Sequence, residues 1–371
     1  MKKMLIKAFT KINLGDDLFI KILCERYPDV QFFIECSEEE AKPFEKITNL
    51  KAFQPFLIER IIKKVNRTFS IEIPEFISKR KKIIDSSLGT VNIGGSIFIQ
   101  DDNWKSKVKN YNEMVLSSRN YYIIGSNFGP FQDKDYLTSY TEVFKQVNDV
   151  CFREKYSYDL FSENNNVRYA PDVVFTMDTK NDLSIKNTDD EKYIVISIID
   201  LSNRAALKMQ EDHYINAVYN IIVDAQARNY KVSLMSFCEY EGDLIAINKI
   251  KNYFEEKGSS LSGVSSYNYN GNMVEALSII ENSSGVVATR FHSVILGLLF
   301  NKPLYPFIYS SKTLNVLNDI GFKGKYTHIN EIEQLDTASV VSQLEDYSAI
   351  DISKQCTEAE NQFYKLDQLL N

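Results

Sequence analysis

Short apolar segments alternate with amphipathic segments along nearly the whole sequence, and this alternation limits the folds that the chain can adopt. Residues 4–9 and 30–34 have the pattern of buried strands, and residues 18–27 between them have that of a helix. Further strands are predicted at 91–93, 121–124, 150–152, 193–199, 231–236, 285–288 and 304–308, and helical patterns separate most of them. Because strands that alternate with helices form parallel sheets covered on both faces, the sequence predicts an α/β fold. Ligands of such folds bind beyond the carboxyl ends of the strands.

The length of 371 residues predicts two domains, since a single hydrophobic core rarely grows that large. Residues 179–192 are polar and charged and have neither helical nor strand periodicity, so we interpret them as a linker. We therefore expect two Rossmann-like domains that face a cleft, over residues 1–180 and 191–350. Residues 351–371 show a further helical pattern, and we expect this helix to cross back to the first domain.

Composition and charge narrow the classes of function. A hydrophobic fraction of 44% and a charged fraction of 25% are typical of a folded globular protein. A formal net charge of -7, with basic residues spread along the chain, argues against a nucleic acid partner. The five cysteines form no CxxC pair for zinc or redox chemistry, so the sequence indicates no metal site and favours a reducing cytoplasm.

The sequence predicts no membrane-spanning segment. The first residues are basic, but Lys7 interrupts their apolar stretch, unlike the apolar core of a signal peptide. The longest later apolar run, residues 294–300, is far shorter than the roughly 20 residues that cross a bilayer. Residues 56–84 mix apolar and basic side chains, which fits either peripheral contact with an anionic membrane or a solvated helix and loop. We expect a cytoplasmic protein, with any membrane contact at the inner face of the cytoplasmic membrane.

The first motif, Asn-Leu-Gly-Asp-Asp at residues 13–17, joins a predicted strand to a helix. Gly15 suits a tight turn there, and Asp16 and Asp17 lie at the helix N-terminus. One interpretation is a helix cap. The other is a pair of carboxylates that bind sugar hydroxyls or accept their protons.

Two glycine-rich turns follow predicted strands, Gly94-Gly95-Ser96 and residues 125–130. Glycine lets a ligand approach the backbone closely, although each turn also fits an ordinary chain reversal.

An arginine, Arg153, lies where the predicted strand 150–152 passes into a helix, and Asp172 follows shortly afterwards. A strand end at a cleft suits recognition of an anion by arginine, while a simple surface charge is the alternative. Asp172 is expected to orient Arg153 or to cap the next turn.

The most specific motif is Arg-Phe-His-Ser at residues 290–293, between the predicted strand 285–288 and an apolar helix. The chain has only three histidines, so His292 beside Arg290 at a helix N-terminus indicates a functional pair. The alternative is a histidine of the core. Tyr309 and Lys312 follow the next predicted strand, which places them near the same sheet edge.

Taken together, these motifs resemble the polysaccharide pyruvyl transferase family. The matching elements, in the family's order, are Asn-x-Gly-Asp at 13–16, Gly-Gly-Ser at 94–96, Arg-Glu-x-x-Ser at 153–157, Pro-Asp at 171–172, Glu-Gly-Asp at 241–243, Arg-x-His-Ser at 290–293 and Tyr-x-x-Lys at 309–312. One departure is Phe-Cys-Glu-Tyr at 237–240, where the family tends to have Pro, Gln or His.

The resemblance implies a fold similar to the two-domain GT-B glycosyltransferases. It also implies transfer of pyruvate, as a ketal, from phosphoenolpyruvate to a sugar of a bacterial capsular polysaccharide or exopolysaccharide, or of its lipid-linked precursor. The first domain would then serve the acceptor and the second would serve phosphoenolpyruvate. Phosphoenolpyruvate is a co-substrate, and no cofactor is expected.

The residues suit this chemistry in the following roles. Phosphoenolpyruvate carries a carboxylate and a phosphate, so cations and hydrogen-bond donors must hold it. The expected donor-binding residues are Arg153, Arg290, Ser293, Tyr309 and Lys312. His292 is the expected acid, or else a hydrogen-bond donor to the departing phosphate, and Asp16 or Asp17 is the expected base. The expected acceptor-binding residues are Asn13, Gly15, Gly95 and Asp172. We expect His292→Ala and Arg290→Ala to abolish transfer and to leave the fold intact.

Two other functions fit the same pattern. A GT-B nucleotide-sugar glycosyltransferase shares the expected architecture, and fold alone does not decide function. A noncatalytic carbohydrate-binding subunit of a polysaccharide assembly complex would bind ligand without releasing phosphate.

Overall fold

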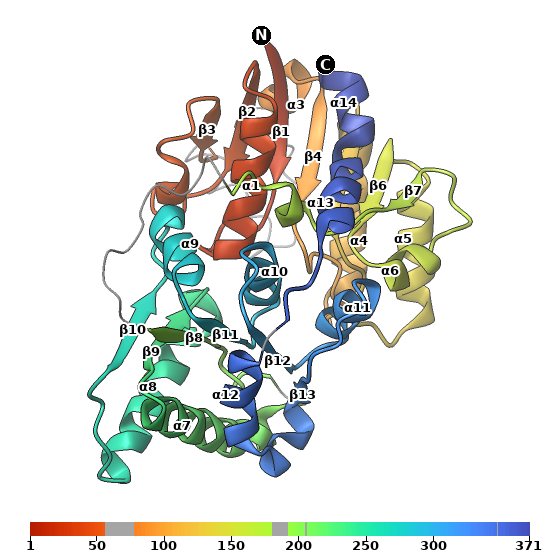
Figure 1. Cartoon of the computed structure of the whole chain (residues 1–371). Helices are drawn as coiled ribbons and strands as arrows, with labels where there is room; N and C mark the ends of the chain where they lie inside the picture. The colour runs from red at the N-terminus through yellow and green to blue at the C-terminus, as the bar shows by residue number, and fades with distance from the viewer. Residues whose placement is uncertain (56–77, 180–191, 205, 347) are drawn as a thin grey trace, which may run out of the picture. The chain divides into compact units, whose positions relative to one another are not determined.

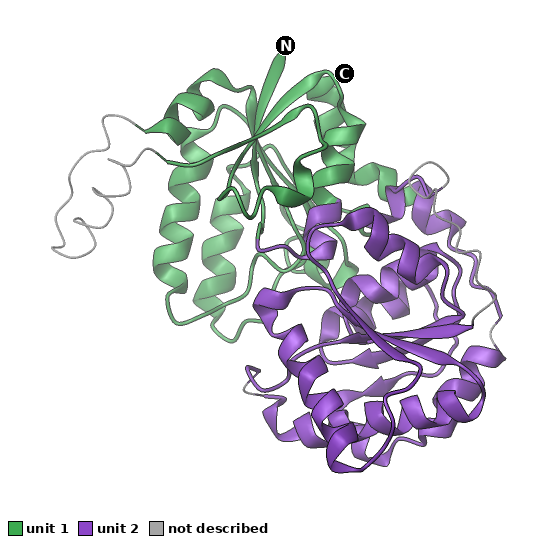
Figure 2. Ribbon diagram, turned by 90° about the vertical axis from the view of Figure 1, so that its left-hand side faces the viewer, with its two compact units in different colours: residues 1–10, 19–173, 358–371 green, residues 11–18, 174–357 purple. Residues whose placement is uncertain are grey.

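The computed structural model describes residues 1–55, 78–179, 192–204, 206–346 and 348–371. Contacts divide the chain into two compact units, which Figure 2 shows in different colours. The first unit comprises residues 1–10, 19–173 and 358–371, and the second comprises residues 11–18 and 174–357. The predicted domain range 1–180 differs from the first unit at residues 11–18 and 174–179, which group with the second unit, and at residues 358–371, which the first unit includes. Nearly all of the predicted linker lies outside the described residues.

The first unit contains a seven-stranded parallel sheet with the order β3-β2-β1-β4-β5-β6-β7 in the described residues (Figure 1). Its strands are β1 (Lys2–Lys7), β2 (Val30–Glu35), β3 (Leu50–Phe53), β4 (Gly89–Ile93), β5 (Tyr121–Ser126), β6 (Asp149–Phe152) and β7 (Val167–Tyr169). Its helices are α1 (Leu14–Arg26, whose first turn groups with the second unit), η1 (Lys42–Phe44), α3 (Lys79–Ser86), α4 (Trp104–Ser117), α5 (Lys134–Phe144) and α6 (Lys155–Asp159). The strand order reverses between β1 and β4, as in a doubly wound fold.

The core beside α4 and α5 is built largely from aromatic rings. Phe98, Phe128, Tyr140 and Phe144 are buried there and meet one another with ring centroids 5.1 to 6.2 Å apart. Most of these pairs are edge-to-face, which the charge distribution of aromatic rings favours. The chain has 22 tyrosines and 23 phenylalanines, and this cluster accounts for some of them.

The end of the chain returns to the first unit. It contains α13 (Ser353–Ala359), η6 (Glu360–Phe363) and α14 (Tyr364–Leu370). Nζ of Lys2 donates to the carbonyl oxygen of Leu370 at 2.7 Å, and Figure 1 shows the two termini near each other. The Arg26 guanidinium forms two hydrogen bonds with Asp367, at 3.0 and 2.8 Å. The prediction that a C-terminal helix crosses back to the first domain is confirmed.

The second unit contains a six-stranded parallel sheet with the order β10-β9-β8-β11-β12-β13 in the described residues. Its strands are β8 (Tyr193–Ile198), β9 (Lys231–Ser236), β10 (Val264–Asn268), β11 (Gly285–Ala288), β12 (Leu304–Ile308) and β13 (Thr327–His328). Its helices are η2 (Val173–Thr176, at the boundary of the units), η3 (Lys208–Gln210), α7 (Glu211–Ala227), η4 (Glu239–Glu241), α8 (Asp243–Glu256), α9 (Met273–Glu281), α10 (Phe291–Leu299), α11 (Ser311–Asp319), η5 (Ile329–Gln334) and α12 (Thr337–Glu345).

Helices cover both faces of this second sheet (Figure 1). Helix α7 packs against α8 and α12, whereas α10 packs against α9 and α11. The strand order reverses between β8 and β11, so this sheet is doubly wound as well. The predicted α/β fold with two Rossmann-like halves is confirmed.

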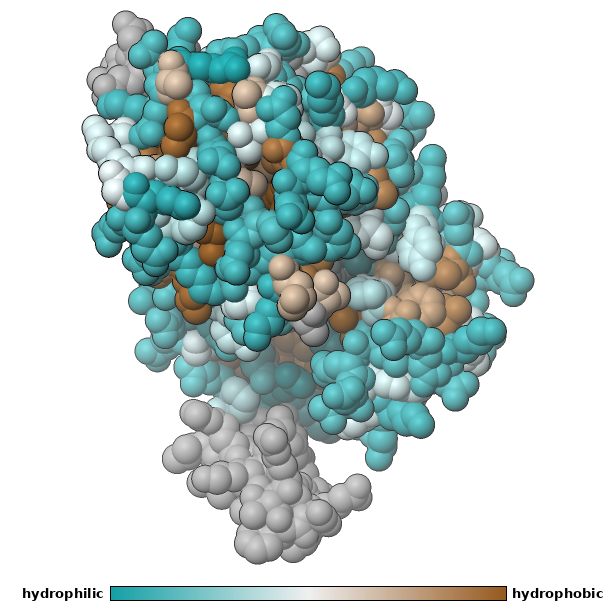
Figure 3. Space-filling view, turned by 90° about the horizontal axis from the view of Figure 1, so that it is seen from below, coloured by the Kyte–Doolittle hydropathy of each residue, from teal (hydrophilic) through white to brown (hydrophobic). Residues whose placement is uncertain are grey.

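The surface is mostly hydrophilic on the face that Figure 3 shows, with hydrophobic residues in small groups. No helix among the described residues combines the length and the apolar character that a membrane span requires. The predicted basic and apolar segment, residues 56–84, lies outside the described residues except at 78–84.

Candidate functional site

The carboxyl ends of four neighbouring strands bring the polar motifs of the second unit to one sheet edge. Because β9, β8, β11 and β12 are adjacent and parallel, the segments that follow them start on the same side of the sheet. The segments that carry the polar side chains are 200–204 after β8, 237–243 after β9, 289–293 after β11 and 309–312 after β12. The order of the strands reverses between β8 and β11, which is where doubly wound folds bind ligands.

Arg290 is held at this edge by a forked ion pair with Asp243. Nε of Arg290 donates to Oδ2 of Asp243 at 3.0 Å, and Nη2 donates to Oδ1 of the same carboxylate. Asp243 is fully buried and also accepts the backbone N–H groups of Phe237 and Cys238, both at 2.9 Å. The remaining edge of the guanidinium contacts Glu241 through Nη1. Arg290 therefore has a fixed orientation, and a shell of carboxylates and backbone amides maintains it.

His292 lies in the first turn of α10 and is packed against Gly15. The side chain is partly exposed. A Cβ atom built on Gly15 would lie 1.7 Å from Nδ1 of His292, so the imidazole fills the space that a side chain would need there. The structure thus brings the first and fourth sequence motifs together within the second unit.

Ser293 connects α10 to the sheet. Its hydroxyl group donates to the carbonyl oxygen of Arg290 at 2.6 Å and lies 2.7 Å from Oγ of Ser197, and the residue is fully buried. Oγ of Ser197 in turn accepts the backbone N–H of Arg290 at 3.1 Å. These contacts favour a positioning role for Ser293 over the predicted contact with the donor.

Of the two acidic residues in the first motif, Asp17 is fully buried and Asp16 is partly exposed. Oδ2 of Asp17 accepts the Tyr269 hydroxyl at 2.8 Å, while its Oδ1 has no hydrogen-bond partner among the described residues. Burial raises the pKa of Asp17 well above its usual range, and the Tyr269 hydrogen bond opposes this only in part. Burial thus disfavours the charged form of Asp17, and of the two residues the partly exposed Asp16 better suits the role of base.

Asn13 shapes the loop before α1. Its Oδ1 accepts the backbone N–H of Gly15 at 3.1 Å, and the N–H of Leu14 donates to the carbonyl oxygen of Phe237 at 3.1 Å. The first bond fixes the turn within the loop, and the second joins the loop to the segment that follows β9.

Tyr309 is surrounded by cations. The ring centroid lies 5.0 Å from Cζ of Arg204 and 5.6 Å from Nζ of Lys312. Burial alone would raise the pKa of Tyr309, but Lys312, Arg290 and Arg204 together lower it below its ordinary value. The structure thus places the predicted residues Tyr309 and Lys312 near Arg290. Arg204, which the sequence analysis missed, belongs to the same cluster.

In the first unit, Arg153 is anchored in a similar way. Its side chain is 2% exposed, and Nη1 donates to Oδ2 of Asp172 at 2.9 Å while Nη2 donates to Oδ1 of Asn127 at 2.8 Å. A Cβ atom on Gly95 would lie 2.6 Å from Nη2 of Arg153. Asp172 therefore contacts Arg153, as its predicted orienting role requires, and its predicted contact with the acceptor stays a prediction.

The predicted site residues are therefore distributed over both units. Gly95, Arg153 and Asp172 belong to the first unit, and the others belong to the second. Convergence of Arg153 with Arg290 and His292 stays a prediction. In the described residues, no group of three or more His, Cys, Asp and Glu side chains is arranged to hold a metal ion.

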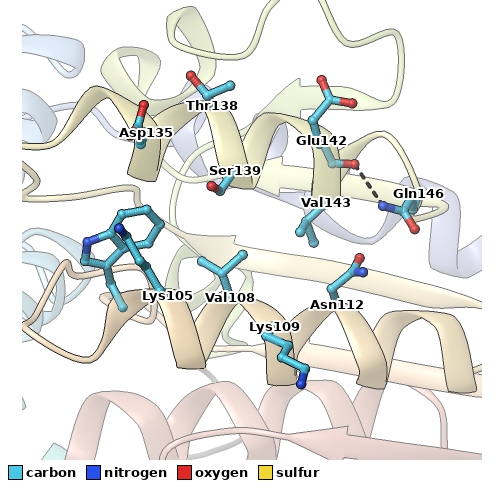
Figure 4. A pocket seen from close by; sticks show the side chains of 11 residues that line it. Lys105, Val108, Lys109, Asn112, Asp135, Thr138, Ser139, Glu142, Val143 and Gln146 are labelled. Atoms are coloured by element: carbon cyan, nitrogen blue, oxygen red, sulfur yellow. Dashed lines mark hydrogen bonds between the residues drawn. The ribbon is translucent and has the colours of Figure 1, made fainter.

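A groove of about 640 Å³ lies elsewhere on the first unit, between α4 and α5 (Figure 4). Lys105 and Asn112 line it from α4, and Asp135 and Glu142 line it from α5. None of the predicted site residues contributes to this groove.

Comparisons with solved structures identify the fold. The UDP-GlcNAc 2-epimerase of Methanocaldococcus jannaschii, in complex with UDP-GlcNAc and UDP, superimposes with a TM-score of 0.60 at 9% identity, over 99% of this chain and 100% of the epimerase. HepE of Anabaena, in complex with UDP, superimposes with a TM-score of 0.54 at 12% identity, over 100% of this chain and 99% of HepE. At such low identity these similarities show the fold alone, which is GT-B-like.

Sequence comparisons identify the family. Amylovoran biosynthesis protein AmsJ of Erwinia amylovora is 22% identical over 307 residues, which cover 76% of this chain and 71% of AmsJ. A family model described as polysaccharide pyruvyl transferase matches residues 13–311, a range that includes all the predicted site residues except Lys312. The chain therefore belongs to the polysaccharide pyruvyl transferase family.

Proposed function

We propose that the protein transfers the pyruvyl unit of phosphoenolpyruvate to two hydroxyl groups of one sugar, forming a ketal and releasing phosphate. The sugar would belong to a bacterial capsular polysaccharide or exopolysaccharide, or to its lipid-linked precursor. The observation that carries the proposal is the anchored Arg290 with His292 at the start of α10, in a chain that matches the pyruvyl transferase family from residue 13 to residue 311.

The cation cluster of the second unit suits a donor with two anionic groups. Arg290 has a fixed guanidinium, Lys312 lies beside Tyr309, and the N-terminus of α10 adds the positive end of a helix dipole. We propose that Arg153, in the first unit, also binds phosphoenolpyruvate, because it belongs to the Arg-Glu-x-x-Ser motif of the family.

The proposed reaction has two stages. His292 protonates the methylene carbon of phosphoenolpyruvate, which becomes a methyl group, and a first sugar hydroxyl attacks the adjacent carbon and loses its proton to Asp16. A second hydroxyl of the same sugar then attacks that carbon, the bond from the carbon to the phosphate oxygen breaks, and phosphate leaves with its electron pair. The second hydroxyl proton returns to His292, and the proton on Asp16 passes to the departing phosphate, directly or through water, so that both residues regain their starting protonation states. Lys312 and Tyr309 stabilise the charge on the departing phosphate.

The decisive experiment is incubation of the protein with phosphoenolpyruvate and a panel of hexose acceptors. Phosphate release and product mass are measured together, and the His292→Ala variant is the control. We expect phosphate release that depends on the acceptor, and a product heavier by one pyruvyl ketal. Binding of a sugar without phosphate release would contradict the proposal and support a noncatalytic subunit.

Thermal stabilisation by different donors distinguishes the proposal from nucleotide-sugar glycosyl transfer. We expect phosphoenolpyruvate to raise the melting temperature, because a ligand that binds only the folded state stabilises it. Stabilisation by UDP-sugars alone would overturn the proposed donor.

A further inference from the structure

One carboxylate oxygen at the edge of the second sheet accepts hydrogen bonds from two arginines. Oε2 of Glu241 accepts from Nη2 of Arg204 at 3.1 Å and also from Nη1 of Arg290. The exposed fractions of the Glu241 and Arg204 side chains are 32% and 31%, whereas that of Arg290 is 7%. The shared oxygen thus lies at the border between the buried ion pair and solvent.

Two guanidinium groups on one oxygen are the arrangement with which proteins bind phosphate and carboxylate groups of ligands. Burial would raise the pKa of Glu241, but the charges of Arg290, Arg204 and Lys312 lower it, and the same three cations lower the pKa of Tyr309. Arg204, Arg290 and Lys312 therefore all act on both Glu241 and Tyr309.

The two carboxylates that contact Arg290 differ in how firmly they are held. Asp243 is fully buried and accepts two backbone N–H groups, so it fixes one edge of the guanidinium. Glu241 ends the three-residue turn η4 and is followed by Gly242, which has a φ of 91°. A change in the Glu241 rotamer would therefore leave the pair between Arg290 and Asp243 in place.

We propose that Arg204 and Arg290 together bind one oxyanion group of the donor, and that Glu241 competes internally for the same two guanidinium groups. The inference rests on the proposed function for the identity of that donor, phosphoenolpyruvate. The oxyanion is either the phosphate or the carboxylate of this molecule. The opposing view is that Glu241 serves only to orient the two arginines.

The two views predict opposite effects of Glu241→Gln. If Glu241 competes with the ligand, the variant binds phosphoenolpyruvate more tightly, by about fivefold to tenfold, because the neutral amide releases both guanidinium groups. If Glu241 only orients the arginines, the variant binds more weakly. Arg204→Gln is expected to weaken binding about tenfold, the effect of losing one charge-assisted contact.

Glu239→Gln is the matched control because it makes the same chemical change in the same turn. Glu239 accepts from Nδ2 of Asn268 at 2.7 Å and belongs to η4. We expect the affinity of this variant for phosphoenolpyruvate to stay within about twofold of the parent protein, since water and salt screen the exposed charge of Glu239. Tighter binding by both variants to the same extent would overturn the inference, because it would reflect net charge alone.

Isothermal titration of the full chain with phosphoenolpyruvate, inorganic phosphate and pyruvate tests the inference and separates it from the proposed function. Tighter binding of phosphate by Glu241→Gln assigns the phosphate group to the two arginines, and tighter binding of pyruvate assigns the carboxylate. If Glu241→Gln tightens binding of inorganic phosphate while no variant binds phosphoenolpyruvate, the oxyanion site stands and the proposed donor fails. If phosphoenolpyruvate binds the parent protein and Glu241→Gln weakens this binding, the inference fails, and phosphoenolpyruvate remains the proposed donor.

Discussion

The imidazole of His292 occupies the space in which a side chain on residue 15 would lie, with Nδ1 only 1.7 Å from the Cβ position of Gly15. Gly95 has the same relationship to Arg153, because a Cβ atom on residue 95 would lie 2.6 Å from Nη2 of Arg153. Neither glycine is among the residues with positive φ. Gly15 and Gly95 are therefore needed for space beside a functional side chain, whereas the sequence had suggested a tight turn or close approach of a ligand.

We expect Gly15→Ala to reduce pyruvyl transfer by about 100-fold, because displacing a catalytic group by about 1 Å has effects of that size. The fold should survive, since residue 15 lies in the first turn of α1, where alanine is favourable. The measurement is the initial rate of phosphate release with an acceptor, alongside the melting temperature.

Gly258→Ala is the control for this substitution. Its φ of 64° disfavours alanine, and nothing lies within 4 Å of the added Cβ atom. We expect a loss of stability of about 1 kcal/mol with unchanged activity. An active Gly15→Ala variant would show that the proximity of His292 to this loop has no role in the reaction.

The buried carboxyl group of Asp17 gives a prediction about pH. The pKa of Asp17 is raised in the folded protein, so the folded state keeps a proton that the unfolded chain releases at lower pH. Its contribution to stability is therefore lost as the pH rises from the unfolded pKa through the folded one. Asp17→Asn removes this titration, so the variant should gain stability relative to the parent protein as the pH rises. Urea unfolding near pH 5 and near pH 8 measures the difference.

The same substitution separates the two acidic residues in catalysis. We expect Asp17→Asn to retain most of the activity, because the asparagine still accepts the Tyr269 hydrogen bond. Asp16→Asn should lower the rate about 100-fold or more, as expected for loss of a general base. An inactive Asp17→Asn variant with normal stability would return the role of base to Asp17.

The ion pair between Arg290 and Asp243 changes one expectation from the sequence. Arg290→Ala would leave the buried Asp243 carboxylate without its partner, so we no longer expect this variant to keep the fold intact. Asp243→Asn removes the buried carboxylate that holds Nε and Nη2 of Arg290, and leaves the more exposed Glu241 as its ionic partner. This substitution should lower the free energy of unfolding by about 3 to 5 kcal/mol, as is typical when one partner of a buried pair is removed. Denaturant unfolding measures this loss.

The exposed pair between Lys145 and Glu142 is the comparison, with a separation of 2.6 Å and exposed fractions of 52% and 64%. Glu142→Gln should lower the free energy of unfolding by less than about 1 kcal/mol, because water and salt screen exposed charges. Equal effects of the two substitutions would mean that burial of the Asp243 pair is energetically unimportant.

The sequence predicted the inner strands of both sheets and missed the four strands at their edges, β3, β7, β10 and β13. Inner strands are buried on both faces and appear as continuous apolar runs, as in the five buried residues of β12. Edge strands are short and partly exposed. β10, with the sequence Val-Ser-Ser-Tyr-Asn, has no fully buried residue and therefore gives no apolar signal.

The candidate site was predictable where a residue follows an inner strand, because strand order then fixes the sheet edge that it occupies. Arg290, His292 and Tyr309 belong to this class. Arg204 was missed because it lies in a loop after β8, six residues beyond the strand end, and its role appears only through contacts with Glu241 and Tyr309. The burial of Asp17 beside Tyr269 could not be predicted either, because 252 positions separate the two residues in the chain and only the fold brings them together.

The C-terminal segment is fastened to the first unit by the buried side chain of Gln362. Its Oε1 accepts the backbone N–H of Gly125 at 3.0 Å, and its Nε2 donates to the carbonyl oxygens of Ala170 at 2.7 Å and Pro171 at 3.0 Å. Pro171 directly precedes Asp172, the partner of Arg153. Gln362 thus connects the end of the chain to the backbone that positions the anchored arginine of this unit.

Gln362→Ala should lower the free energy of unfolding by about 2 to 4 kcal/mol, because it leaves buried backbone groups without partners. It should also lower the rate of pyruvyl transfer when the variant is assayed well below its melting temperature, since Asp172 and Arg153 lose their support. Gln368→Ala, on the exposed face of α14, should change stability by less than about 0.5 kcal/mol and leave the rate unchanged. A stable and fully active Gln362→Ala variant would show that the returning C-terminal segment has no part in holding Arg153.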